Sequence, residues 1–252
     1  MMTVKGLVVS EHSVGESDKF ISILTSGYGT IDVRVRGANK ITGKNHAATQ
    51  LFGYSEFCLE SSRDRYYLNS SRVIYDFFNL RLDIKKLALA CYMGEVARFT
   101  VLASNKQHEN DVMRLILNCL YMLDSDKRSC EFIKSVFELR FVSEIGFIPQ
   151  LIGCRVCYTY DAEEMFFLVD KAYVLCRDDF EEMGLTENRC SIKITPSELA
   201  ALQFIALVPL ERIFNFRLSE KSQAKINEIT EKYILFRLNR SFNSLEYYHT
   251  VS

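Results

Sequence analysis

The chain has 252 residues, of which 48% are hydrophobic and 25% charged, values close to those of ordinary globular proteins. This composition excludes a disordered tail, a collagen and a low-complexity chain. The 31 basic and 32 acidic residues give a net charge of -1, which as a total argues against a strongly basic nucleic-acid binder.

The first 80 residues predict a small β domain. Five runs of β-forming residues alternate with turn signals; they are 5–10, 20–25, 30–36, 51–60 and 66–75. Polar and apolar residues alternate strictly in the third run, which places Arg34 and Arg36 together on its outer face. Five strands without a long helix predict an OB-fold barrel, with an SH3-like barrel as the alternative.

From Leu82 onward the apolar residues follow a helical spacing. Asp83 and Asn110 predict the N-caps of two helices, and a third helix runs from Cys130 until Gly146 ends it. These features predict an N-terminal domain over residues 1–80 and a helical domain over residues 81–252.

The helical domain is interrupted at about 150–190, where the sequence predicts an irregular, acidic segment. Thr195 and Glu198 then form a capping box around Pro196, which predicts the start of a helix. The last long helix begins near Ser219. Its buried stripe is predicted to contain Ile226, Ile229, Tyr233 and Phe236.

Charge is unevenly distributed along the chain. Residues 33–55 contain Arg34, Arg36, Lys40 and Lys44 without any acidic residue, whereas residues 161–187 contain nine acidic and two basic residues. The aromatic residues around the predicted barrel are Tyr28, Phe52, Tyr54, Phe57, Tyr66 and Tyr67. A basic groove with aromatic platforms is how OB-folds hold single strands of nucleic acid. The alternative is a solvated strand edge with the aromatic rings in the core.

The eight cysteines do not predict a disulfide framework. The N-terminus lacks both the apolar run and the small-residue cleavage site of a signal peptide, so we expect a cytoplasmic protein, in which thiols stay reduced. No window contains 18 uninterrupted apolar residues, so we expect no membrane span. Four cysteines lie singly among apolar residues and are predicted to be buried; they are Cys58, Cys91, Cys119 and Cys130.

Two blocks of motifs carry a family resemblance. The first contains Gly6-Leu7-Val8-Val9-Ser10-Glu11, Gly15-Glu16-Ser17-Asp18-Lys19, Leu24-Thr25, Gly29 and Arg34-Val35-Arg36-Gly37-Ala38-Asn39-Lys40. The second contains Phe137-Glu138-Leu139-Arg140, Gly146-Phe147-Ile148-Pro149, Cys154-x-x-Cys157 and Arg240-Ser241-Phe242-Asn243-Ser244-Leu245. In order and spacing these motifs span nearly the whole chain, and they resemble the bacterial RecO family of DNA repair and recombination mediators.

The resemblance implies an α+β protein. An N-terminal five-stranded OB-fold barrel would pack on a mainly helical C-terminal domain with an inserted zinc-finger-like segment. The implied activity is non-enzymatic: binding of single- and double-stranded DNA, annealing of complementary strands and, with RecR, loading of RecA onto DNA coated by single-stranded DNA-binding protein (SSB). Arg34, Arg36 and Lys40 match the family's basic barrel segment, so we expect them to contact phosphates, with Lys44 in addition.

The implied partners are DNA, RecR and the C-terminal tail of SSB, with RecA as an indirect partner. The implied location is the cytoplasm, in association with the nucleoid. We expect neither a membrane partner nor a small-molecule substrate.

The resemblance also implies a metal site with the pattern C-x2-C-x18-C-x2-C, which is a zinc signature. The corresponding residues here are Cys154, Cys157, Cys176 and Asp179. An aspartate stands where the family usually has the fourth cysteine, and a carboxylate can also bind zinc. Recruitment of Cys190 and a metal-free loop are the alternatives. Tyr158 stands where a tight knuckle usually has glycine.

Two other functional classes compete with a DNA-annealing protein. The chain could be a scaffold whose helical domain binds SSB or RecR. The basic face of the last long helix, which could accept an acidic tail, consists of Lys221, Lys225, Lys232, Arg237 and Arg240. An enzyme is disfavoured because the sequence lacks a glycine-rich phosphate loop, an H-E-x-x-H motif and a G-x-S-x-G motif.

Overall fold

The computed structural model describes residues 1–37, 45–62, 65–100 and 106–252, with only the backbone described at 106–109. The chain divides into two compact units. The first contains Met1–Lys127 and Phe242–Ser252, and the second contains Arg128–Ser241. The predicted boundary near residue 80 stays a prediction. No helix in the described ranges is long and apolar enough to cross a membrane.

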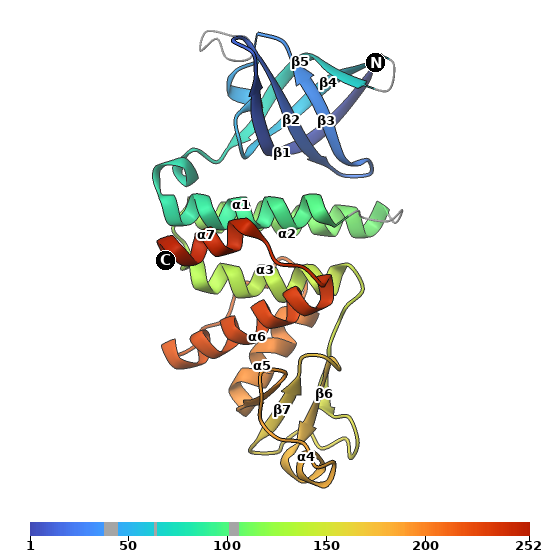
Figure 1. Cartoon of the computed structure of the whole chain (residues 1–252), viewed down its shortest axis with the longest axis vertical. Helices are drawn as coiled ribbons and strands as arrows, with labels where there is room; N and C mark the ends of the chain where they lie inside the picture. The colour runs from blue at the N-terminus through green and yellow to red at the C-terminus, as the bar shows by residue number, and fades with distance from the viewer. Residues whose placement is uncertain (38–44, 63–64, 101–105) are drawn as a thin grey trace. The chain divides into compact units, whose positions relative to one another are not determined.

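Alternating apolar residues build a closed five-stranded barrel in the first unit (Figure 1). Its strands are β1 (Met2–Val14), β2 (Asp18–Thr25), β3 (Gly29–Val35), β4 (Gly53–Ser62) and β5 (Arg65–Asp76). They pair in the order β1-β2-β3-β5-β4, and β1 closes onto β4. Only the β3–β5 pair is parallel among the described strands of the barrel. The predicted OB-fold is confirmed.

The barrel core follows the period of two that the sequence predicts. Ile31, Val33 and Val35 of β3 are buried and join a cluster of apolar side chains from the other strands. Gly6 of β1 leaves room for this packing. A Cβ atom at Gly6 would lie 2.3 Å from Cγ2 of Ile23, so no other residue fits there without a shift of β2.

Two short 3₁₀ helices, η1 (Ala47–Thr49) and η2 (Phe78–Leu82), and three α-helices complete the first unit. The α-helices are α1 (Ile84–Phe99), α2 (Lys106–Asp124) and α7 (Asn243–Val251). The carboxylate of Asp83 accepts the backbone N–H groups of Lys85 and Lys86, which confirms the predicted cap of α1. The predicted cap at Asn110 is wrong, because α2 begins four residues earlier at Lys106.

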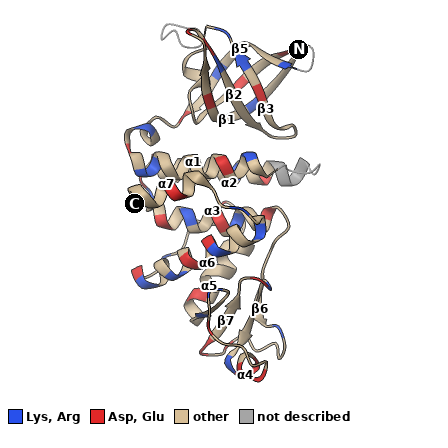
Figure 2. Ribbon diagram, viewed as in Figure 1, with Lys and Arg blue, Asp and Glu red and all other residues tan. Residues whose placement is uncertain are grey.

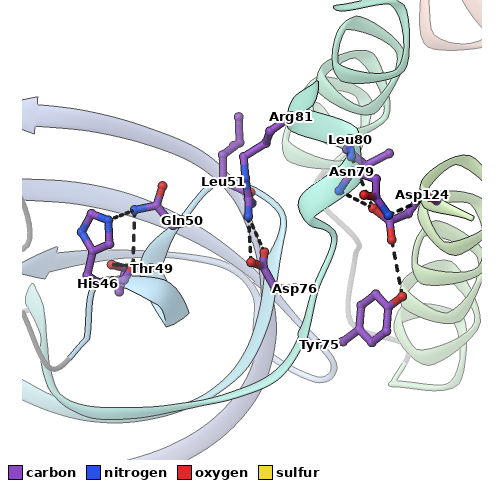
Figure 3. Close-up of polar contacts among 10 residues, drawn as sticks. All are labelled: His46, Thr49, Gln50, Leu51, Tyr75, Asp76, Asn79, Leu80, Arg81 and Asp124. Carbon is purple, nitrogen blue, oxygen red and sulfur yellow. Dashed lines mark hydrogen bonds and ion pairs between the residues drawn. The ribbon is translucent and has the colours of Figure 1, made fainter. Parts of the chain in front are cut away.

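A buried carboxylate at the end of α2 fixes the connection between barrel and helices (Figure 3). Oδ1 of Asp124 accepts the backbone N–H groups of Asn79 (2.8 Å) and Leu80 (3.3 Å), and Oδ2 accepts the hydroxyl of Tyr75 (3.4 Å). Arg81 donates to both carboxylate oxygens of Asp76, at 2.6 and 2.8 Å. These contacts tie β5, η2 and α2 to one another within the first unit.

The second unit combines three long α-helices and one short one with a small sheet (Figure 1). The helices α3 (Cys130–Glu144), α5 (Pro196–Leu207) and α6 (Glu220–Leu238) pack together. Thr195 and Glu198 form the predicted capping box of α5, and the side chain of Ser219 caps α6. The predicted buried stripe of α6 is wrong at Phe236, which is 47% exposed.

The segment predicted to be irregular contains a four-stranded sheet instead. Its strands are β6 (Gln150–Cys154), β7 (Met165–Leu168), β8 (Tyr173–Cys176) and β9 (Ser191–Ile194), in the order β6-β8-β7-β9. A short helix, α4 (Arg177–Glu182), follows β8 directly. The prediction failed because the strands are only four or five residues long. All four residues of β7 are buried, so that strand shows no alternation.

Candidate functional site

Three cysteines and an aspartate converge at one end of the small sheet. Cys154 is the last residue of β6, Cys157 lies in the turn after it, Cys176 is the last residue of β8, and Asp179 lies in the first turn of α4. One sulfur or carboxylate oxygen from each residue lies within 4.8 Å of the others, so the cluster could hold a metal ion. The fold therefore brings the four predicted ligands together, and Cys190 is not part of this cluster.

The turn between Cys154 and Thr159 has the form of a tight knuckle. The N–H of Cys154 donates to the carbonyl oxygen of Thr159 (2.8 Å), and the N–H of Tyr158 donates to that of Cys154 (3.1 Å). Tyr158 has a φ of 62°, the left-handed conformation for which glycine is preferred. A residue other than glycine costs roughly 1–2 kcal/mol there. The surrounding contacts must therefore hold this strained conformation.

Hydrogen bonds from sulfur control the charges within the cluster. The thiols of Cys154 and Cys176 donate to Oδ2 of Asp179, at 2.9 and 3.0 Å. The bond from Cys154, followed by those from the other thiols, lowers the pKa of Asp179 to about 2. Burial, followed by the carboxylate of Asp179, raises the pKa of Cys176 to about 12. The carboxylate is therefore ionised at neutral pH, while the Cys176 thiol keeps its proton until a cation displaces it.

The donor set fits a tetrahedral zinc ion. Zn–S bonds of about 2.3 Å place two thiolates of a tetrahedral site about 3.8 Å apart. Sγ of Cys157 and Sγ of Cys176 are 3.6 Å apart, close to this value. The two S–O distances to Asp179 are shorter because protons lie between these atoms, and they would lengthen slightly around a cation.

A cavity of about 450 Å³ adjoins the cluster, and its lining includes Cys157, Cys176 and Asp179. Glu164, on the same cavity, pairs with both Arg177 and Lys193. The acidic charge predicted for this segment is therefore partly neutralised by local ion pairs.

On the barrel, the two predicted DNA-contacting arginines have different surroundings. Nη2 of Arg34 lies 2.8 Å from Oδ2 of Asp18, whose Oδ1 accepts the backbone N–H of Gly37 at 3.1 Å. The bond from Arg34, followed by that from Gly37, lowers the pKa of Asp18. The pairing of Asp18 with Arg34 is not predicted by the sequence, although both residues are in the motifs that carry the family resemblance.

Arg36 is exposed, and its guanidinium lies 5.3 Å from the centre of the Tyr67 ring. Parallel pairing of β3 and β5 places Tyr67 opposite Arg34, so the arginines and the ring share one part of the barrel wall. Lys40 and Lys44, the other two predicted contacts, lie outside the described residues.

The aromatic residues around the barrel fall into two groups. Phe57 is buried in the barrel core, Phe52 is buried outside this core cluster, and Tyr66 packs against the core from a partly buried position, while Tyr54 is half-buried. Tyr28 is well exposed, and Tyr67 is half-buried beneath Arg36. The rings that could stack with a base are therefore fewer than the sequence suggested.

Two of the five residues predicted on the basic face of α6, Lys232 and Arg237, are engaged in contacts within the second unit. Figure 2 shows acidic residues among the basic ones along this helix. Lys232 pairs with Glu228 at 2.7 Å, and Arg237 donates to the carbonyl oxygens of Val169 (2.8 Å) and Asp170 (3.1 Å). These contacts reduce the charge available to an acidic tail on this helix.

Comparison with known proteins identifies the family of the chain. Residues 1–77 match the family described as Recombination protein O N terminal, and residues 81–246 match Recombination protein O C terminal. The chain is 30% identical over 250 residues to DNA repair protein RecO of Acetivibrio thermocellus, with 99% of this chain and 97% of the relative covered. It is 27% identical to DNA repair protein RecO of Caldicellulosiruptor bescii, with 100% and 99% covered. Two family matches and near-complete coverage of these relatives show that the chain belongs to the RecO family of DNA repair proteins.

Proposed function

We propose that this chain is a non-enzymatic recombination mediator. It binds single- and double-stranded DNA through the barrel and anneals complementary strands. With RecR, it helps load RecA onto DNA coated by SSB. Membership of the RecO family supports the repair role. The observation that carries the DNA-binding part is the exposed Arg36 guanidinium beside the Tyr67 ring.

This pair offers both interactions that a single strand requires. A guanidinium can bind a phosphate, and a tyrosine ring can stack with the adjacent base, which contributes about 1–3 kcal/mol per base in single-strand binding proteins. Arg34 is less available, because it already pairs with Asp18. We therefore assign Arg36 the larger share of the binding free energy, with Lys40 and Lys44 as further phosphate contacts.

Annealing follows from the same charges. Two complementary strands repel each other through their phosphates, and a basic surface that holds both lowers this repulsion. Neither step breaks or forms a covalent bond, so the barrel needs no catalytic group for this function.

The test compares Arg36→Ala with Arg72→Ala. Arg72 is also an exposed arginine of the barrel, but it pairs with Glu56 at 3.2 Å. The affinity for a fluorescent oligothymidylate is measured by anisotropy over a range of salt concentrations. We expect Arg36→Ala to reduce the slope of log K against log salt by about 0.7, the value for one lost phosphate contact on a single strand. Arg72→Ala should leave the slope unchanged.

Annealing of complementary oligonucleotides, with and without SSB, is measured on the same variants. Equal slopes and equal annealing rates for Arg36→Ala and the unmodified chain would refute DNA binding at this part of the barrel. The scaffold hypothesis would then be preferred.

We also propose that the cluster of Cys154, Cys157, Cys176 and Asp179 holds zinc. The support is the donor set, whose sulfur spacing suits a tetrahedral site. Zinc at such a site stabilises the fold by linking the ends of β6 and β8 to α4. Metal analysis by mass spectrometry after purification with zinc should find one zinc per chain, and a value near zero would remove the site.

A further inference from the structure

The three thiols of the cluster differ in their access to solvent. Cys154 and Cys176 are buried and both donate to Oδ2 of Asp179, whereas Cys157 is exposed in the knuckle turn. The sulfur of Cys157 lies 3.6 Å from that of Cys176. An exposed sulfur is therefore in van der Waals contact with a buried one.

We propose that Cys157 and Cys176 are a modification site, at which a hydroperoxide closes a reversible disulfide and thereby displaces the metal ion. The displacement rests on the zinc site proposed above, whereas formation of the disulfide does not.

The chemistry needs one hydroperoxide per disulfide. The sulfur of Cys157 attacks the terminal oxygen of the hydroperoxide, the O–O bond breaks, and the products are a sulfenic acid on Cys157 and an alcohol or water. The sulfur of Cys176 then attacks the sulfenic sulfur, an S–S bond forms, and the hydroxyl leaves as water with the thiol proton. The two thiols lose two electrons in total, and the hydroperoxide gains them.

The geometry favours this pair over the others. The hydroperoxide can reach Cys157 from solvent, and the adjoining cavity of about 450 Å³ is lined by both Cys157 and Cys176. A disulfide needs an S–S distance of about 2.05 Å, so the sulfurs must approach each other by about 1.5 Å. Cys157 lies in a surface turn, where a rotation of its side chain can supply this movement. Cys154 is buried and is not among the residues that line this cavity, so it is left as the remaining thiol.

The loss of two of the four ligands gives the disulfide its consequence. Here the disulfide leaves only one thiol, on Cys154, and one carboxylate, on Asp179. Structural zinc sites are almost always four-coordinate, so two remaining ligands cannot retain the ion. A single two-electron oxidation therefore removes the whole site.

The test uses the full chain, first reduced and freed of metal with a chelator. Hydrogen peroxide is added, and the chain is digested without reductant for peptide mapping by mass spectrometry. We expect a cross-link between the Cys157 and Cys176 peptides, with the loss of two hydrogen atoms, and its disappearance after dithiothreitol. Cys190→Ser is the matched control, because Cys190 is partly exposed and lies outside the cluster. It should form the same cross-link, and Cys157→Ser should not.

The second arm uses the zinc-loaded chain and a chromophoric chelator that reports released zinc. Peroxide should release zinc several-fold faster than buffer alone, both from the unmodified chain and from Cys190→Ser, and reduction should allow zinc to bind again. A cross-link to any other cysteine, or irreversible sulfinic acid without a cross-link, would overturn the proposal. Equal release rates with and without peroxide would overturn the displacement. A chain that takes up no zinc refutes the proposed zinc site, while the mapping of the metal-free chain still decides whether the disulfide forms.

Discussion

Replacement of Asp124 tests the connection between the barrel and its helices most directly. The side chain is 5% exposed and accepts hydrogen bonds from the backbone N–H groups of Asn79 and Leu80 and from the hydroxyl of Tyr75 (Figure 3). Asp124→Ala removes the acceptor oxygens of all three hydrogen bonds at once. Because Leu80 is fully buried, no water can easily replace the lost partner of its N–H group.

The expected loss in the free energy of unfolding follows from the hydrogen-bond donors that Asp124→Ala leaves without an acceptor. A buried donor that loses its acceptor costs about 1–3 kcal/mol. The buried N–H group of Leu80 therefore suggests a loss of about 1–3 kcal/mol in the free energy of unfolding, with smaller parts from Asn79 and Tyr75, which are exposed and can bind water instead. Asp124→Asn keeps a carbonyl oxygen for the N–H groups and should lose less.

The assay is urea unfolding followed by far-UV circular dichroism, with Asp126→Ala as the matched control. Asp126 lies two residues away and pairs with Lys86 at 2.6 Å, but its side chain is 76% exposed, so its removal should cost at most about 1 kcal/mol. If Asp124→Ala is no less stable than Asp126→Ala, the hydrogen bonds to the Asp124 carboxylate do not stabilise this connection.

Three further predictions concern charged groups elsewhere. Asp179→Ala should lower the zinc content of chains purified with zinc, whereas Asp179→Cys should keep one ion per chain by mass spectrometry. Lys134 is buried between the carboxylates of Glu138 and Glu231, so Lys134→Met should cost about 3–5 kcal/mol in urea unfolding, and additional replacement of Glu138 by Leu should recover much of this loss. Arg34 lowers the pKa of Asp18 in the folded chain. The contribution of Asp18 to stability is therefore present above the pKa of the unfolded chain and is lost as the pH falls through the folded pKa. The difference in the free energy of unfolding between the unmodified chain and Asp18→Asn should narrow below about pH 4 and stay constant from pH 5 to 7.

The barrel could be predicted because β3 and β4 each alternate between buried and more exposed residues. In β3 this alternation identifies both the core residues and the outward Arg34. The partner of Arg34 could not be predicted in the same way. Asp18 is 16 residues earlier in the chain, and only the register of β2 against β3 brings the two side chains together.

For the cluster of Cys154, Cys157, Cys176 and Asp179, the sequence indicated the residues but not the strands that carry them. The structure brings the four predicted ligands together, since two pairs of ligands with short separations can meet wherever two turns lie side by side. The sheet that carries these turns was not predicted, because its short strands lack a periodic pattern. The predicted N-cap at Asn110 and the predicted burial of Phe236 were wrong for a similar reason. Helical periodicity defines a face well, but it defines the ends of a helix poorly.

The packing of α7 against α1 has a consequence for the order of folding. The ring of Phe242 contacts those of Tyr92 and Phe99, and Glu95 of α1 accepts the backbone N–H of Ser244. Residues 128–241 are therefore an insertion within the first unit. During synthesis the ribosome makes the barrel first. It makes α7, the last helix of the first unit, only after the entire second unit. Until then α1 exposes an aromatic surface, so the first part of the chain to be made is among the last to be completed.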